Sequence, residues 1–250
     1  VLQPLYSGGT SFLMSTVQFL LHPLKWLEAI ARHGVTHSGA PNFAYAACVQ
    51  ALARAPQWNA RLDSWRYATC GAEPVRATTL DAFSQAFTPF GFHRAALAPS
   101  YGLAEAVLAV TVKNAATPLQ QITLDAQAIE RHEVRPADHE ATGTRTLVGC
   151  GSALPGFQLR IVDPDTRTPC APDRIGEIWV AGPSVGQGYW GQPDVSAEHF
   201  GGTLAPEVAD PTRYLRTGDL GFLHGGELFV AGRRTDLIIA NGRNLYPQDL

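Results

Sequence analysis

The order of apolar runs in residues 1–115 most constrains the fold, because short runs typical of strands alternate with longer patterns typical of amphipathic helices. One such helix is expected over residues 23–32, with a proline at its start and Gly34 beyond its end. Further helices are expected at residues 43–54 and 75–87, and strands at residues 35–37, 65–70 and 95–98. This alternation predicts an α/β unit with a mostly parallel sheet flanked by helices.

The pattern changes from residue 147, where short strands follow one another at intervals marked by turn residues. Strands are expected at residues 157–162 and 176–181, and a hairpin is expected at residues 220–231, with Gly225-Gly226 as its turn. We therefore expect a smaller β-rich, barrel-like subdomain over residues 147–233, either a small β-barrel or a twisted sheet. The polar, poorly periodic residues 116–146 are expected to form a solvent-exposed insertion between the two units.

Composition excludes several classes of protein. Charged residues are 16% of the chain and apolar ones 45%, which argues against disorder. A net charge of -3 without a basic run predicts no nucleic-acid partner, and no apolar run approaches the ~18 residues of a membrane span. The four widely spaced cysteines favour reduced thiols in a cytoplasmic protein. Because the chain lacks an initial Met and stops within an ordered-looking motif at Leu250, we expect a piece of a longer protein.

Two strand ends in the first unit carry candidate binding residues, since ligands of such sheets lie beyond the carboxyl ends of the strands. One is the GAEP run at residues 71–74, and the other is YGLAEA at residues 101–106. The ring of Tyr101 could stack on a purine, Gly102 would permit a close approach, and Glu105 offers the hard oxygen that Mg²⁺ prefers. The alternative is a loop-to-helix junction with a core tyrosine and a surface glutamate.

A third candidate is Asp219, which follows a glycine just before an expected strand. Its carboxylate can accept two hydrogen bonds at once, which suits the vicinal hydroxyls of a ribose, and Gly218 keeps the approach open. The charged elbow at residues 232–236 is either a solvated turn or a hinge near a nucleotide. A further apolar run at residues 237–240 is expected to be a strand.

The order and spacing of these motifs resemble the adenylate-forming superfamily of acyl-CoA synthetases, luciferases and nonribosomal adenylation domains. The resemblance rests on GAEPVR, YGLAEA, RTGD and the Gly-Arg at residues 232–233, in that order along nearly the whole chain. The final GRNLYPQDL, residues 242–250, looks most like the fatty-acyl-AMP ligase branch. Ala104 departs from the threonine of many members, and Thr235 from their usual lysine or aspartate. The GYW run at residues 188–190 also matches, where the superfamily uses it mainly as structure.

The resemblance implies part of the N-terminal domain of an adenylate-forming enzyme that uses ATP and Mg²⁺. Glu105 would hold the metal, Asp219 the ribose hydroxyls, and Arg233 the ribose or phosphate, so that Glu105 and Arg233 act in catalysis. The chain would pivot at a hinge, and residues 234–250 would hold this hinge and the start of a C-terminal domain. The implied adenine-binding residues are Gly71, Ala72, Glu73, Pro74, Tyr101 and Gly102, and the implied hinge residues are Arg234, Thr235 and Asp236.

The substrate expected from the sequence is a fatty acid. Residues 39–50 contain no carboxylate that could pair with the ammonium group of an amino acid, and Asn42, Phe43 and Tyr45 are expected to line an apolar pocket. By the resemblance, the parent ligase forms fatty acyl-AMP and transfers the acyl group to an acyl carrier protein. The alternatives are an acyl-CoA synthetase and a non-catalytic nucleotide-binding module. Because the phosphate-binding loop and the catalytic lysine of the superfamily are absent, the isolated chain is expected to be inactive.

Overall fold

The parallel strands of the first unit are three of the five strands of a mixed sheet in the computed structural model, which describes residues 2–139, 141–236, 238–240 and 243–245. The strand order is β1-β2-β3-β4-β7, with β1 to β3 parallel and the last two pairs antiparallel. The bounds are β1 His37–Ala40, β2 Tyr67–Cys70, β3 Leu97–Leu103, β4 Leu108–Val112 and β7 Ser152–Ala153. The predicted α/β unit is therefore confirmed, and its sheet is extended by antiparallel strands.

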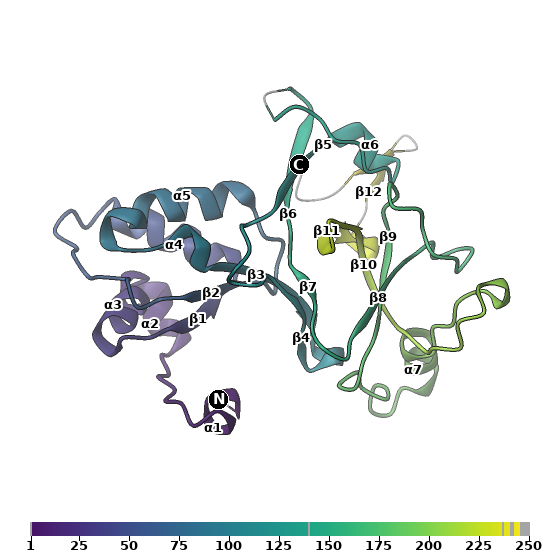
Figure 1. Cartoon of the computed structure of the whole chain (residues 1–250), viewed down its shortest axis with the longest axis horizontal. Coiled ribbons are helices and arrows are strands. Elements are labelled where there is room, and N and C mark those ends of the chain that lie inside the picture. The colour runs from purple at the N-terminus through teal and green to yellow at the C-terminus, as the bar shows by residue number, and fades with distance from the viewer. Residues whose placement is uncertain (1, 140, 237, 241–242, 246–250) are drawn as a thin grey trace.

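Helices surround the parallel strands, and these helices and strands together are called the helical lobe (Figure 1). The third helix begins after Pro23 and ends at Gly34, whose φ of 58° is the left-handed value that glycine adopts without strain, as predicted. Its Trp26 packs edge-to-face on Tyr45 and Trp65, and these rings are part of one core shared by the helices and β2. The bounds are α1 Leu2–Tyr6, α2 Thr16–Leu21, α3 Leu24–His33, α4 Asn42–Leu52 and α5 Ala77–Phe87.

The β-rich lobe contains an open antiparallel sheet with the strand order β11-β10-β9-β8. Its strands are β8 Gln158–Val162, β9 Gly176–Ala181, β10 Leu215–His224 and β11 Glu227–Arg233, and helix α7, Pro193–Phe200, lies beside it. The turn between β10 and β11 is Gly225-Gly226 with φ of 58° and 82°, which confirms the predicted hairpin. The expected β-rich subdomain is confirmed. Of its two expected forms, the closed barrel is not found within the described ranges, because β8 and β11 lie at opposite ends of the strand order and do not pair with each other.

Residues 116–146 are partly folded into the β-rich lobe. They contain β5 Gln121–Asp125, helix α6 Ala126–Glu130 and the start of β6 Thr144–Val148, with β5 and β6 paired. Leu124 and Ile129 are buried in a cluster with Phe222 and Phe229 of the β10–β11 hairpin. The expectation of a solvent-exposed insertion is therefore wrong for this part, because these two apolar side chains cover the hairpin.

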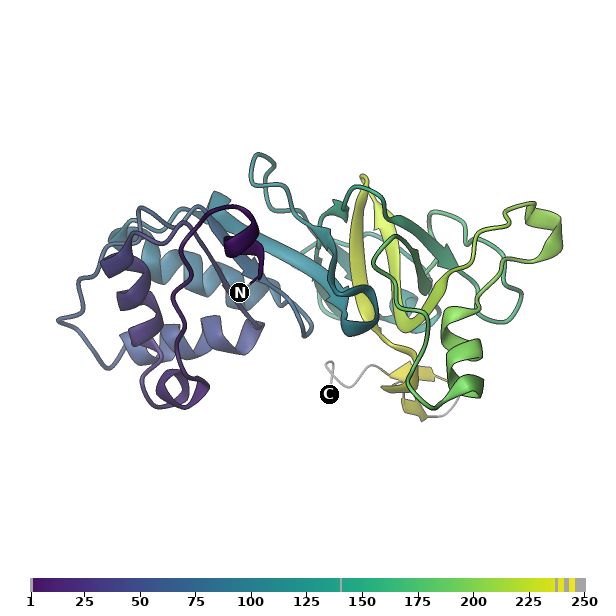
Figure 2. The same ribbon diagram turned by 90° about the horizontal axis from the view of Figure 1, so that it is seen from below.

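Strands β3 and β4 run from the helical lobe to the β-rich lobe, as Figure 2 shows. Beyond β11 the chain forms a short 3₁₀ turn, Arg234–Asp236, and then the paired strands β12 Ile238–Ala240 and β13 Arg243–Leu245. The predicted strand at residues 237–240 is confirmed for its last three residues, while residue 237 lies outside the described part. Gly242 and residues 246–250 of the GRNLYPQDL motif also lie outside it. Other 3₁₀ turns are Thr88–Phe90, Arg94–Ala96, Ala104–Ala106 and Pro206–Val208.

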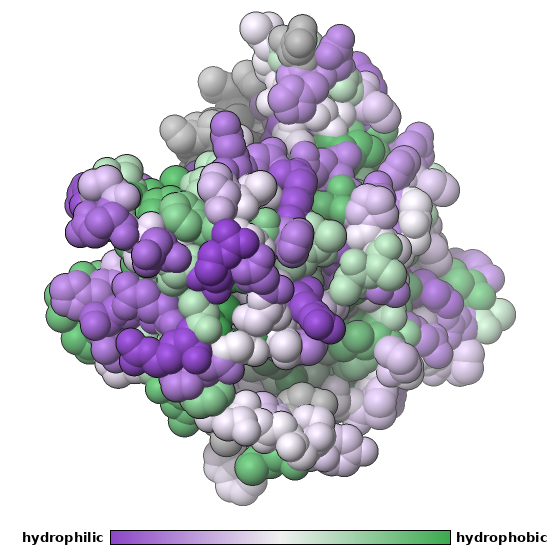
Figure 3. Space-filling model, turned by 60° about the vertical axis from the view of Figure 1, so that its left-hand side comes forward, coloured by the Kyte–Doolittle hydropathy of each residue, from purple (hydrophilic) through white to green (hydrophobic). Residues whose placement is uncertain are grey.

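Hydrophilic and hydrophobic residues are interspersed over the face of the molecule shown in Figure 3. Large exposed hydrophobic side chains gather near the N-terminus, where they include Leu5, Tyr6, Leu13 and Leu21. Among the helices that the structure describes, none combines the length and the apolar character that a membrane crossing needs.

Candidate functional site

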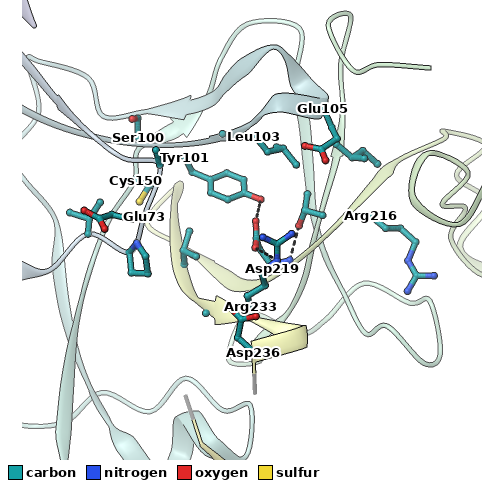
Figure 4. A pocket seen from close by; sticks show the side chains of 18 of the residues that line it. Glu73, Ser100, Tyr101, Leu103, Glu105, Cys150, Arg216, Asp219, Arg233 and Asp236 are labelled. Atoms are coloured by element: carbon teal, nitrogen blue, oxygen red, sulfur yellow. Dashed lines mark hydrogen bonds and ion pairs between the residues drawn. The ribbon is translucent and has the colours of Figure 1, made fainter. Parts of the chain in front are cut away.

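A cavity of about 470 Å³ lies between the two lobes and is lined by segments far apart in the sequence. They include the loop after β2, the end of β3 with the turn after it, the middle of β10, and the end of β11. Figure 4 shows Glu73 and Glu105 at different sides of this cavity, with Tyr101 and Asp219 between them. The predicted site residues on its wall are Ala72, Glu73, Pro74, Tyr101, Gly102, Glu105, Asp219, Arg233 and Asp236. Gly71 lies behind the wall, where the carbonyl oxygen of Ser100 would be 2.7 Å from an added Cβ.

Tyr101 lies on β3, which is longer than predicted and reaches the cavity. The strand continues past residue 98 to Leu103, and Tyr101 is only 9% exposed. At Gly102 the pairing register with β4 shifts, and an added Cβ would overlap the carbonyl oxygen of Leu108 and lie 2.9 Å from the Cα of Ala109. The close approach expected at Gly102 therefore exists, but the atoms that approach belong to the neighbouring strand.

The centre of the site is a hydrogen bond between two predicted residues that are 118 positions apart. The Tyr101 hydroxyl donates to Oδ2 of Asp219 at 2.8 Å, and Nε of Arg233 lies 3.8 Å from Oδ1 of the same carboxylate. Burial raises the pKa of Asp219, although the Tyr101 hydrogen bond and the Arg233 charge oppose this shift. Burial and the charge of Asp219 raise the pKa of Tyr101, so Tyr101 remains a neutral donor. Figure 4 shows both side chains pointing into the cavity.

Glu105 forms a second polar centre in the same cavity. The hydroxyl of Tyr189 donates to its Oε1 at 2.6 Å, and this hydrogen bond lowers the pKa of Glu105, with a further contribution from the charge of Arg233. The turn that carries Glu105 is fixed because its carbonyl accepts from the Gly186 N–H at 2.7 Å. Glu105 is therefore held as a carboxylate.

The donor set at Glu105 fits Mg²⁺ in the presence of a phosphate-bearing substrate. Proteins bind this ion through one or two carboxylates and leave its other positions to water and phosphates. Within the described ranges, no group of three or more His, Cys, Asp or Glu residues could hold a metal ion by itself. Glu105 would thus supply one oxygen, and a bound ion would neutralise phosphate charge beside it.

Several residues of the cavity wall were not found by sequence reasoning. Tyr189, interpreted above as mainly structural, contacts Glu105, and His199 of α7 packs edge-to-face on Tyr189 at 5.9 Å. The His199 Nδ1 atom also lies 3.2 Å from the Arg216 carbonyl oxygen. A tyrosine between a glycine and a tryptophan was the available signal for Tyr189, whereas a lone histidine gives none. Other such residues are Ser100, Leu103, Cys150 and Thr217.

The residues expected to line an acyl pocket do not border this cavity. Tyr45 is fully buried in the aromatic core and donates to the Thr69 carbonyl oxygen at 2.8 Å. Asn42 accepts from the Arg76 N–H at 3.0 Å, and the Phe43 N–H donates to Oε1 of Glu73 at 2.6 Å. Tyr45 and Asn42 therefore act here as packing and loop-fixing residues, and Glu73 ties the start of α4 to the cavity.

The three expected hinge residues form the exposed 3₁₀ turn after β11. Arg234 lies 3.9 Å from Asp165, Thr235 donates to Asp236 at 3.2 Å, and Asp236 borders the cavity. The turn thus lies directly beside the cavity and follows Arg233 in the chain. Rotation about it stays a prediction.

One cavity brings together an aromatic ring, a carboxylate suited to ribose and a second carboxylate suited to Mg²⁺. These are the features of a nucleotide-binding α/β protein. In agreement, residues 1–190 match the family model described as AMP-binding enzyme, and the chain belongs to this family. The predicted recognition of an adenylate-forming fold is thereby confirmed.

Named relatives cover the whole chain. The medium-chain-fatty-acid–[acyl-carrier-protein] ligase JamA of Moorena producens (strain JHB) is 46% identical, with 100% of this chain and 42% of JamA aligned. The corresponding ligase TtuA of Teredinibacter turnerae is 36% identical, with 100% of this chain and 40% of TtuA aligned. The crystal structure of a fatty acyl-adenylate ligase from L. pneumophila, in complex with acyl adenylate and pyrophosphate, superposes with a TM-score of 0.89 at 44% identity, over 100% of this chain and 43% of that one. The chain thus spans about two fifths of the length of these relatives.

Proposed function

We propose that the chain is part of a ligase that activates a fatty acid with ATP to fatty acyl-AMP, releases pyrophosphate, and passes the acyl group to an acyl carrier protein. The observation that carries the proposal is the meeting of Tyr101, Glu105, Asp219 and Arg233 around one cavity, centred on the 2.8 Å Tyr101–Asp219 contact. The names of the two relatives, which describe fatty-acid ligases for acyl carrier proteins, support the substrate and the acceptor.

The proposed reaction makes modest demands on covalent chemistry. An oxygen of the fatty-acid carboxylate attacks the α-phosphorus of ATP while the bond to pyrophosphate breaks, so positioning and charge neutralisation carry most of the catalysis. The loop at residues 71–74 and the ring of Tyr101 would hold the adenine, and Asp219 would accept from the ribose hydroxyls. Arg233 would face the ribose or phosphate, and Glu105 would hold Mg²⁺, which supplies positive charge to the phosphates.

A fatty acid is preferred to an amino acid as the substrate because residues 39–50 offer no carboxylate to an ammonium group. The proposed acyl pocket includes Phe43, which is half exposed, with Asn42 and Tyr45 behind it. Since Tyr45 is fully buried here, its place in that pocket would require the core around it to open. The four cysteines are free, which fits a cytoplasmic location for the whole protein.

The test is an activity assay of the whole protein with ATP, Mg²⁺ and a panel of fatty acids, followed by CoA or a phosphopantetheinylated carrier protein in separate reactions. Acyl-AMP formation with transfer to the carrier alone is the expected result. Transfer to CoA would instead identify an acyl-CoA synthetase, and the absence of adenylate with every acid would favour a non-catalytic nucleotide-binding module.

Two variants test the division of roles within the site. Asp219→Ala should raise the KM for ATP more than Thr235→Ala does, because only Asp219 is proposed to contact the nucleotide. Equal effects on KM would contradict the proposed ribose contact. The isolated chain of 250 residues should bind nucleotide without forming acyl-AMP, and robust acyl-AMP formation would contradict this.

A further inference from the structure

Glu177 of β9 is a buried carboxylate outside the cavity, and its side chain is only 3% exposed. Its Oε2 accepts from Nε1 of Trp179 at 2.9 Å and from Nη2 of Arg216 at 3.2 Å. Its Oε1 accepts from the backbone N–H of Gly218 at 3.1 Å. A buried charge is costly unless it is paired and hydrogen-bonded, and both oxygens of Glu177 have such partners.

The partners of Glu177 lie at a bulge in β10. Arg216 pairs with Trp179 and Leu220 with Glu177, so residues 217–219 of β10 stand opposite Ile178 alone. Gly218, in the middle of this bulge, has a φ of 73°, the left-handed region that favours glycine. Backbone groups in a bulge lose their partners in the neighbouring strand and need others.

Side chains replace the missing strand partners at this bulge. Glu177 accepts the Gly218 N–H, and the hydroxyl of Thr217 accepts the Asp219 N–H at 3.0 Å while it donates to the Ile178 carbonyl oxygen at 2.7 Å. The Gly218 N–H belongs to the Thr217–Gly218 peptide, so Glu177 fixes the peptide before Gly218, and Thr217 fixes the next one, which leads into Asp219. The direction of the Asp219 carboxylate thus depends on a side chain that does not reach the cavity.

Glu177 also holds the positive charge of Arg216 away from Asp219. Arg216 is only 23% exposed, and its guanidinium lies 5.4 Å over the ring of Trp179 and on the carboxylate of Glu177. Figure 4 shows Arg216 turned away from Asp219. Asp219 is therefore left to Tyr101 and to the more distant Arg233. Without the negative charge of Glu177, Arg216 would lose its ion-pair partner. It lies at the start of the bulge that contains Asp219.

We propose that Glu177 is a positioning residue for ribose recognition: it holds the β10 bulge and Arg216 so that the Asp219 carboxylate faces the nucleotide. This inference rests on the proposed function, in which Asp219 binds the ribose hydroxyls. It assigns Glu177 no contact with the nucleotide. Loss of Glu177 should therefore affect only the part of the nucleotide-binding energy that comes from the ribose hydroxyls.

The test compares Glu177→Gln with the unaltered whole protein. Glutamine has nearly the same shape as glutamate. However, its NH₂ group must face another donor, which is either the Gly218 N–H or the side chains of Arg216 and Trp179. Calorimetry would measure the dissociation constants of AMP and of 2′,3′-dideoxy-AMP, which lacks both ribose hydroxyls. We expect the preference for AMP to fall about tenfold in Glu177→Gln, the size expected from one misaligned charge-assisted hydrogen bond. Binding of 2′,3′-dideoxy-AMP should change little.

Two controls separate the possible outcomes. Glu207→Gln makes the same charge change at an exposed residue and should keep the full preference for AMP. Asp219→Ala should abolish it. If the unaltered protein shows no preference for AMP, the ribose contact of the proposed function fails. If it shows one that Asp219→Ala removes and Glu177→Gln retains, the role of Glu177 alone is overturned.

A second measurement covers the case in which Glu177→Gln does not fold. In the unaltered protein, the amide hydrogen of Gly218 should exchange slowly with solvent, because it is bonded to a buried carboxylate. Exchange at the rate of an exposed amide would overturn the inference, whatever the variant does.

Discussion

Replacement of Gly102 by alanine should destabilise the fold, because the new Cβ would occupy space held by the backbone of β4. It would overlap the Leu108 carbonyl oxygen and lie 2.9 Å from the Cα of Ala109. Both are main-chain atoms, so no side-chain rotation can relieve the contact. The strands must separate where Gly102 pairs with Ala109 and Leu103 with Leu108.

The cost follows from overpacking and from weakened hydrogen bonds across the strand pair. Overpacking a tight site costs about 1–3 kcal/mol, and each weakened backbone hydrogen bond adds about 1 kcal/mol. We therefore expect the free energy of unfolding to fall by about 3 kcal/mol. For a chain of 250 residues this corresponds to a melting temperature lower by roughly 6–12 °C.

Thermal unfolding followed by circular dichroism would measure the effect, with Gly9→Ala as the matched control. At Gly9 the nearest atom to an added Cβ is the Pro4 carbonyl oxygen at 3.6 Å, an ordinary contact, so this variant should melt close to the unaltered chain. If Gly102→Ala melts like the control and only nucleotide binding weakens, the reasoning is refuted. Gly102 would then serve the approach of the ligand and not that of β4.

Three further perturbations test the backbone and the two carboxylates. Leu108 has a φ of 100° and is 71% exposed, so Leu108→Gly should relieve strain and raise the free energy of unfolding by about 1 kcal/mol; a lower urea midpoint would contradict this. Tyr189→Phe removes the hydrogen bond that lowers the pKa of Glu105, so an NMR titration of that carboxyl should shift to higher pH, and an unchanged curve would refute the assignment. Burial raises the pKa of Asp219 above its ordinary 3.8, so the folded chain binds this proton more tightly than the unfolded chain does. The stability that results from this shift is therefore complete below pH 3.8 and is lost as the pH rises through the pKa of Asp219 in the folded chain. Tyr101→Phe removes an opposing hydrogen bond and raises this pKa further, so it should destabilise the chain more at pH 8 than at pH 4; equal losses in urea unfolding at both pH values would argue against it.

The sequence was sufficient where local chemistry decides the structure. Pro23 and Gly34 delimit α3 because one starts a helix and the other adopts the left-handed conformation that ends it. Gly225-Gly226 determines the hairpin for the same kind of reason. Tyr101 and Asp219 became candidates through their side-chain chemistry next to a glycine together with the family resemblance, and the structure brings them within 2.8 Å of each other.

The sequence pattern leaves open what contacts between distant residues decide. Whether β8 and β11 meet to close a barrel depends on the twist and the edges of the whole sheet, which a pattern of short strands does not encode. The aromatic segment of Tyr45 predicts a substrate pocket, and it does not encode that Trp26 and Trp65 pack against the Tyr45 ring in this structure. Tyr189 was missed because its partner Glu105 is 84 residues away.

Glu105 and Asp219, two of the carboxyl groups that border the cavity, have pKa shifts in opposite directions, because hydrogen bonding outweighs burial at only one of them. At Glu105 the short hydrogen bond from Tyr189 outweighs a small desolvation, so its pKa is lowered. At Asp219 the similar bond from Tyr101 is weaker than the effect of deeper burial, so its pKa is raised. Burial therefore favours the protonated form of Asp219, whereas the hydrogen bond from Tyr189 favours the charged form of Glu105. In the proposed function, Tyr189 thus helps to keep the metal end of the site charged as the pH falls.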